Sequence, residues 1–129
     1  MANDSYVNLN SVVNSWKEGL VVLMYHMVDV PPLFHGMRGL YVAPGHLGRQ
    51  LRELKAASDI AITTLSEWNS TRPASRQVII TFDDAYLSLY EKGLPVLQET
   101  GVRAINYVIA DLIGQTNLWS RTCRTEKLM

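Results

Sequence analysis

Two adjacent carboxylates, Asp83 and Asp84, directly follow a run of apolar residues, and this junction most constrains how the chain can fold. The run at residues 78–80 is continuous rather than alternating, which is typical of a buried strand of a parallel sheet. Ligands and catalytic groups of α/β folds gather where such strands end. Two neighbouring acids repel each other, so we expect a bound cation or a catalytic proton to compensate them. The alternative is that one of them caps a following helix.

The two side chains can serve one site only under a geometric condition. Neighbouring residues of an extended strand point to opposite faces of the sheet. We therefore expect the strand to end beside Asp83 and Asp84 and the chain to turn there.

The rest of the chain alternates predicted strands with predicted helices, which implies a mainly parallel sheet with crossover helices. Leu47, Leu51 and Leu54 follow a helical spacing. Gly93 and Pro95 interrupt the helical pattern that follows the acidic pair, and Gly101 is the expected cap of its second part. The expected strands cover residues 20–25, 60–63, 78–80 and 104–110, the expected helices 46–57, 65–68, 87–92 and 95–98, and a long loop 29–45.

Composition excludes several classes of protein. The 129 residues are 47% hydrophobic, which suits one domain with a core. Twelve basic and twelve acidic residues give no net charge, so neither nucleic acid nor a membrane surface is an expected partner. The single cysteine, Cys123, excludes an internal disulfide. No apolar run reaches the roughly 18 residues of a membrane span, and we see no secretory signal, so a cytoplasmic location is the default expectation.

We expect three regions along the chain. Residues 1–19 are polar and predicted to be an irregular extension, and residues 20–119 carry the α/β pattern. Residues 120–129 have no apolar pattern until Leu128, which suggests an atypical tail and a possible truncation. A partial sheet would leave open edges through which copies of the chain could associate.

Four segments, in this order, resemble the polysaccharide deacetylase family, the metal-dependent chitin and peptidoglycan deacetylases that share the NodB-homology domain. Residues 81–86 read Thr-Phe-Asp-Asp-Ala-Tyr and are similar to the family motif Thr-Phe-Asp-Asp-Gly-Tyr. The resemblance covers about residues 20–119 and implies an α/β fold, the first half of a (β/α) barrel with parallel strands and crossover helices. The other matching segments are residues 23–26, 47–65 and 94–104.

The resemblance also implies a reaction and its residues. Asp83 resembles the family's general base, and Asp84 resembles its ligand to a divalent metal, usually zinc. In the family, two histidines of a later His-x-x-x-His motif complete the metal site. The implied activity is hydrolysis of N-acetyl groups on the amino sugars of a polysaccharide or glycoconjugate substrate.

The chain departs from the family pattern in two respects. The motif's glycine is Ala85, and alanine disfavours a positive φ. All three histidines, His26, His35 and His46, precede Asp83, so the later metal motif has no match. We therefore expect impaired zinc binding and little or no activity from this chain alone.

Several readings stay open from the sequence. His26 ends a predicted strand and Tyr86 adjoins the motif, so both are expected to line the site, while His35 and His46 are further possible ligands. The chain could instead be a non-catalytic truncated fragment or a carbohydrate-binding pseudoenzyme. A third reading is a magnesium-binding receiver-like domain, for which Asp111 is the candidate acceptor.

Overall fold

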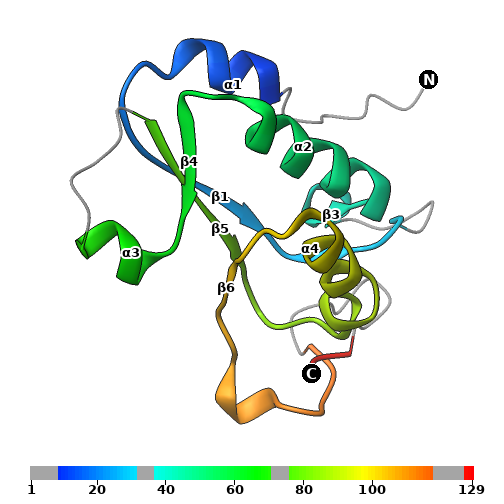
Figure 1. The fold of residues 1–129 in the computed structure, drawn as a ribbon. Coiled ribbons are helices and arrows are strands. Elements are labelled where there is room, and N and C mark those ends of the chain that lie inside the picture. The colour runs from blue at the N-terminus through cyan, green and yellow to red at the C-terminus, as the bar shows by residue number, and fades with distance from the viewer. Residues whose placement is uncertain (1–8, 32–36, 71–75, 118–126) are drawn as a thin grey trace.

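The computed structural model describes residues 9–31, 37–70, 76–117 and 127–129. Its centre is a parallel sheet in which β5 pairs with three other strands (Figure 1). The predicted parallel α/β arrangement is therefore confirmed. The strands of this sheet are β1 (Gly19–Tyr25), β4 (Ile60–Thr63), β5 (Arg76–Phe82) and β6 (Ile105–Asn106).

β5 pairs with β1 along one edge and with both β4 and β6 along the other. β1 pairs with β5 over its whole length, from Gly19 beside Arg76 to Tyr25 beside Phe82. The opposite edge carries β4 as far as Ile79 and β6 from Thr81 onward. β4 therefore leaves the sheet before β6 joins it, which opens a gap between these two strands.

Helices α2 (Pro44–Ala56) and α4 (Leu94–Thr100) cover one face of the sheet (Figure 1). The leucines of α2 that the sequence predicts to share one face are buried against the sheet. They pack with every second residue of β5, because successive side chains of a strand point to opposite faces. The Tyr25 hydroxyl donates to Gln50 Oε1 of α2 at 3.0 Å, and the Tyr25 and Phe82 rings stack 5.4 Å apart. The buried core includes Leu47, Leu51, Leu54, Val78, Ile80 and Phe82.

A second, smaller core lies beyond the carboxyl end of β5. The strands β2 (Met27–Val28) and β3 (Tyr41–Val42) pair in parallel beside it. Its buried members come from four separate parts of the chain, so it joins segments that are distant in sequence. They are Met27, Tyr41, Tyr86 and Leu128.

The helical segment after the acidic pair is continuous rather than broken. A π-helical turn, η2 (Leu89–Gly93), leads directly into α4, so the interruption predicted at Gly93 takes the form of a widened turn. A Cβ at Gly93 would lie 2.8 Å from Leu89 Cδ1 and 3.0 Å from Val28 Cγ2. Gly101 adopts the left-handed conformation (φ 63°) at the end of α4, which confirms the predicted cap.

Three expectations for local structure were wrong. Residues 9–15 form the helix α1 (Leu9–Ser15), whose Leu9 is buried, because apolar residues spaced along this polar segment reach the core. Residues 104–110 supply only the two residues of β6, since β5 ends at Phe82. The expected long loop at residues 29–45 contains regular elements. These are η1 (Arg38–Leu40), β3 and the first residues of α2, while α3 (Leu65–Ser70) and η3 (Ala110–Leu112) complete the described elements.

None of the helices in the described ranges has both the length and the apolar character needed to cross a membrane.

Candidate active site

The chain turns at the acidic pair, as the sequence predicts. β5 ends at Phe82, and the Asp83 amide still donates to the Tyr25 carbonyl oxygen at 2.8 Å. The next two residues then take positive φ values, 69° at Asp84 and 52° at Ala85. Asp83 thus continues the sheet for one residue, and the left-handed turn redirects Asp84 away from an extended course. The alanine keeps a conformation that favours glycine, at a cost of about 1–2 kcal/mol.

The last residues of the chain hold this turn in place. The Met129 amide donates to the Ala85 carbonyl oxygen at 2.9 Å, and the Leu87 amide donates to the Lys127 carbonyl oxygen at 2.8 Å. Ala85 itself is buried. Because backbone hydrogen bonds on both sides restrain it, the turn can retain a conformation that alanine disfavours.

His26 lies beside Asp83 at the carboxyl edge of the sheet. Tyr25 pairs with Phe82, so the residues that follow them occupy neighbouring positions on adjacent strands. Both side chains are partly exposed. The backbone register therefore places His26 beside Asp83 at the carboxyl edge of the sheet, and its role in a site stays a prediction.

The residues after His26 form hydrogen bonds and an ion pair with the helical segment that follows the acidic pair. The Val28 amide donates to Ser88 Oγ at 3.2 Å, and Lys92 Nζ lies 2.6 Å from Asp29 Oδ2. Gly93 allows close contact with Val28. These contacts fix the position of His26 relative to Asp83.

The alternative of helix capping finds no support in the described residues. The π-helical turn that continues from the motif begins without a hydrogen bond from a capping side chain. Within the described part of the chain, no hydrogen bond or ion pair engages the side chain of Asp83 or Asp84. The two carboxylates are thus left for another role.

The other candidate residues have diverse positions. Tyr86 is fully buried, and Asn117 Nδ2 donates to its hydroxyl at 3.4 Å, so its ring supports the turn from within the second core. His46 lies in the first turn of α2. Asp111 lies in η3 rather than at the end of a strand. His35 is outside the described residues.

The described residues do not by themselves fit a catalytic metal site. Catalytic zinc usually has three protein ligands. Nowhere in residues 9–31, 37–70, 76–117 and 127–129 do three His, Cys, Asp or Glu side chains gather closely enough to hold a metal ion. Asp84 is therefore a single candidate ligand, and the register places His26 beside Asp83, the residue before it.

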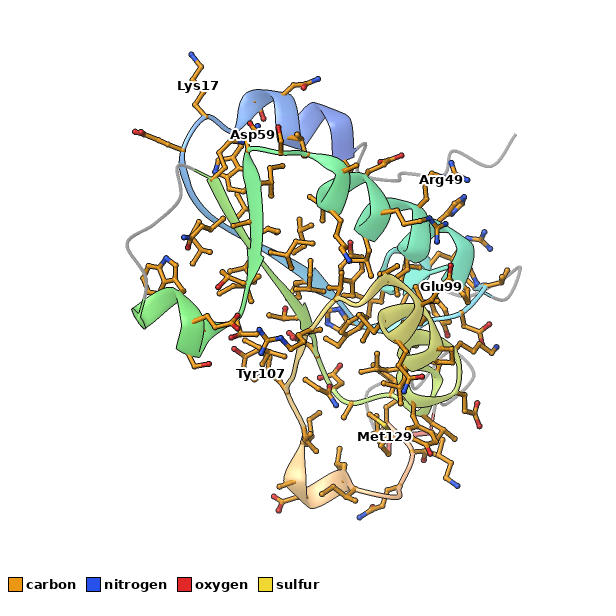
Figure 2. The ribbon with its side chains drawn as sticks, viewed as in Figure 1. Lys17, Arg49, Asp59, Glu99, Tyr107 and Met129 are labelled. Carbon is orange, nitrogen blue, oxygen red and sulfur yellow. The ribbon has the colours of Figure 1, made fainter. Side chains whose placement is uncertain are left out.

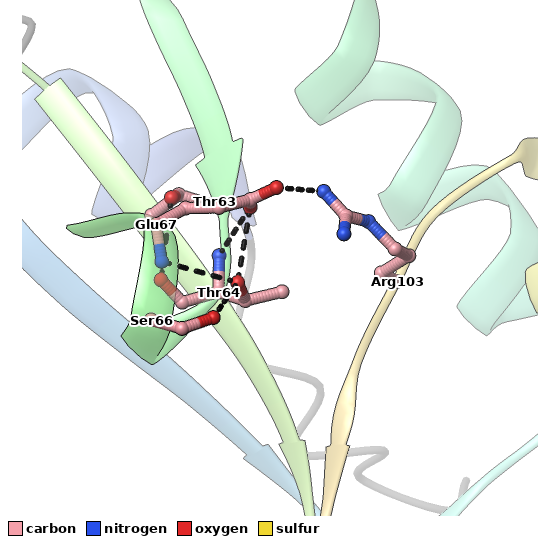
Figure 3. Close-up of polar contacts among 5 residues, drawn as sticks. All are labelled: Thr63, Thr64, Ser66, Glu67 and Arg103. Carbon is pink, nitrogen blue, oxygen red and sulfur yellow. Dashed lines mark hydrogen bonds and ion pairs between the residues drawn. The ribbon is translucent and has the colours of Figure 1, made fainter. Parts of the chain in front are cut away.

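The structure adds a polar cluster that the sequence analysis missed (Figure 3). The Thr64 amide donates to Glu67 Oε2 at 3.0 Å, and the Glu67 amide donates to Thr64 Oγ1 at 3.4 Å, which is a capping box at the start of α3. Arg103 pairs with Glu67 across the gap between β4 and β6. The hydrogen bond from Arg103, followed by those from Thr64, lowers the pKa of Glu67. The pattern Thr-x-x-Glu was available in the sequence as a signal.

This cluster borders a cavity of about 280 Å³ that lies between β4 and residues 101–103, the segment that joins α4 to β6. Lys55 also lines it, but its Nζ donates to the Thr100 carbonyl oxygen at 2.6 Å. The charged groups at this cavity are thus engaged with protein partners.

Comparison with known proteins gives one family match and several similar solved structures. The family described as Polysaccharide deacetylase matches residues 70–127. A solved structure titled IcaB, from Ammonifex degensii, is 26% identical with a TM-score of 0.67, covering 82% of this chain and 45% of that one. A putative polysaccharide deacetylase from Bacillus anthracis is 25% identical with a TM-score of 0.63, covering 75% of this chain and 31% of that one. The Streptococcus pyogenes deacetylase PplD, solved in complex with acetate, is 25% identical with a TM-score of 0.59, covering 84% and 49%.

No curated protein matches the chain at a significant level. The chain spans less than half the length of the solved structures named above. Its parallel sheet corresponds to part of their barrel, with the Asp83–Asp84 turn at the carboxyl edge. From this motif, the family match and the shared fold, it follows that the chain matches the polysaccharide deacetylase family over residues 70–127 and resembles solved polysaccharide deacetylases in its fold.

Proposed function

We propose that this chain is the part of a polysaccharide deacetylase that carries the general base, and that it acts on N-acetylated amino sugars. The observation that carries the proposal is the left-handed turn at Asp83–Asp84, directly after the central parallel strand. The complex of the Streptococcus pyogenes relative with acetate supports the reaction class, because acetate is the product of deacetylation.

In this proposal Asp83 accepts the proton of the water that attacks the acetamide carbonyl. A general base must lie within hydrogen-bond reach of that water and be accessible to it. Asp83 meets the second requirement, since its side chain is partly exposed at the edge of the sheet. Asp84 is the carboxylate that the chain offers to a divalent cation, and zinc is the metal we propose.

We also propose that catalysis needs two ligands beyond those of these 129 residues. No histidine follows Asp84 in the sequence, and the described residues form no group of three candidate ligands. The chain alone should therefore release acetate from N-acetylglucosamine oligomers no faster than its Asp83→Asn variant does.

A complementation assay tests the proposed function. The full chain would be combined with the C-terminal remainder of the Ammonifex degensii relative, which supplies the segments that this chain does not cover. We expect acetate release that exceeds that of either part and is lost in Asp83→Asn. A complex that forms but releases no acetate, or releases it equally with Asp83→Asn, would refute the assignment of Asp83 as the base.

Zinc calorimetry tests the role of Asp84 separately. We expect weak zinc binding by the chain alone and tighter binding by the complemented pair, with the increase removed by Asp84→Ala. Tight binding by the chain alone that disappears in Asp84→Ala would instead show that its own residues complete a site.

The second candidate function is carbohydrate binding without catalysis. The absence of the later histidines from the sequence favours it. Binding of an N-acetylglucosamine oligomer by the chain, together with no Asp83-dependent acetate release from the complemented pair, would select this alternative.

A further inference from the structure

One row of residues crosses the carboxyl edge of the sheet. Asp83 donates its amide to the Tyr25 carbonyl oxygen, and Tyr107 donates its amide to the Phe82 carbonyl oxygen, each at 2.8 Å. These bonds belong to the last pairs of the two ladders, Tyr25–Phe82 and Phe82–Asn106, and His26, Asp83 and Tyr107 are the next residues along the three strands. His26, Asp83 and Tyr107 are therefore level on three neighbouring strands, spaced by about 4.8 Å from one strand to the next.

The three residues of this row share one face of the sheet. Tyr25 and Phe82 pack in the core under α2, and the residue after each points to the opposite face. Figure 2 agrees, because the labelled Tyr107 side chain lies on the side of β6 away from α4. The ring of Tyr107 is thus on the same face as the proposed base.

Tyr107 is exposed although it is large and largely apolar. Its exposed fraction is 53%, and Met24, which precedes His26 by two residues on the same face, is 61% exposed. An apolar surface that adjoins a few polar groups is typical of a ligand site. The aromatic ring and the neighbouring carboxylate together suit a ligand that has both an apolar face and polar substituents.

We propose that Tyr107 is the stacking platform for the sugar ring whose acetamide faces Asp83, an inference that rests on the proposed function. The axial C–H groups of a β-linked N-acetylglucosamine form an apolar face that packs on an aromatic ring. The hydroxyl and acetamide groups lie around the edge of the sugar and remain available to the polar row. Tyr107 thus holds a pyranose ring in a fixed orientation. Asp83 then accepts the proton of the water that attacks the acetamide group of that ring.

The test is a titration of the full chain with the N-acetylglucosamine tetramer, followed by NMR. Loss of an aromatic platform weakens the stacking of a nucleic-acid base by about 5- to 150-fold, and we expect Tyr107→Ala to weaken sugar binding by a factor within that range. Tyr107→Phe keeps the ring and should bind within about threefold of wild type. Tyr90→Ala is the matched control, because Tyr90 is also exposed, at 61%, but lies on η2.

A second measurement guards against a folding defect. The Tyr107 ring signals, assigned with Tyr107→Phe, should shift on addition of the tetramer in the wild-type protein. Wild-type affinity in Tyr107→Ala, an equal loss in Tyr107→Ala and Tyr107→Phe, or unshifted ring signals would each overturn the proposal, as would no binding of the tetramer. Asp83→Asn should still bind the tetramer, so failure of the stacking role is distinguishable from failure of the catalytic assignment.

Discussion

The phenol of Tyr25 makes the stability of the fold sensitive to alkaline pH. Burial raises the pKa of Tyr25 from its ordinary 10.0 to about 12. The hydroxyl donates to Gln50 Oε1 at 3.0 Å, and the ring stacks on Phe82 directly before the acidic pair. The folded state therefore favours the neutral phenol over the phenolate.

The sign of the effect follows from the raised pKa. The stabilisation is complete below about pH 10, where the unfolded chain also holds the proton, and it is lost as the pH rises toward about 12. A shift of about two units corresponds to about 2.7 kcal/mol in total, of which about 1.4 kcal/mol is lost by about pH 11.

The perturbation is Tyr25→Phe, and the assay is urea unfolding at about pH 8, 10 and 11. At about pH 8 the variant should be less stable by about 0.5–1.5 kcal/mol, since it lacks the hydrogen bond to Gln50. By about pH 11 the wild-type protein should have lost about 1.4 kcal/mol relative to the variant, which removes or reverses this difference.

Tyr90→Phe serves as the matched control, because it removes a hydroxyl from an exposed ring on η2. A constant difference between Tyr25→Phe and wild type across this pH range would refute the reasoning, since it would show that the buried phenol is not coupled to folding.

Three further variants test packing and backbone conformation in the same unfolding assay. Gly93→Ala places a methyl group 2.8 Å from Leu89 Cδ1 and should destabilise the fold by about 1–3 kcal/mol. Ala85→Val puts a branched side chain at φ 52° in a buried position and should cost about 2–4 kcal/mol. Thr64→Ala removes the capping hydroxyl of α3 and should cost about 1 kcal/mol.

Each of these variants has its own contradicting result. An unchanged free energy of unfolding for Gly93→Ala would mean that the π-helical turn accommodates the added methyl group without loss of stability. Wild-type stability of Ala85→Val would show that the left-handed turn is not required. For Thr64→Ala, Thr64→Ser is the control that keeps the hydroxyl, and equal losses in both would assign the effect to the methyl group.

The sequence predicts the sheet well where a local pattern determines the structure. The apolar runs correctly located β1, β4 and β5. Of these three, β5 is the strand buried on both faces, because it lies between the others, whereas β1 exposes Val22 and Met24. The leucine spacing located α2, because apolar residues that recur every three or four positions form the buried face of a helix. Gly101 was identified as a cap because few other residues tolerate its φ.

Tertiary contacts decide what the sequence pattern missed. β6 is shorter than its apolar run because a strand ends where its partner β5 ends, which no local pattern records. Tyr86 and Tyr90 are four residues apart, yet one is fully buried and the other exposed, since Leu128 and Met27 enclose only the first. The neighbouring positions of His26, Asp83 and Tyr107 depend on strand register, which links residues far apart in the chain. The catalytic assignment of Asp83 and Asp84 stays a prediction until the variants are measured.

The central place of β5 has a consequence for the synthesis of the chain. β1 and β4 both precede β5 in sequence, and each pairs with it rather than with the other. On the ribosome, both strands therefore leave the exit tunnel before the partner that completes their hydrogen bonds has been made. The apolar strand β1 must wait for the residues from Arg76 to Phe82, and long-range pairing of this kind slows folding. During this interval the nascent chain exposes an unpaired apolar strand, a state that is prone to aggregation.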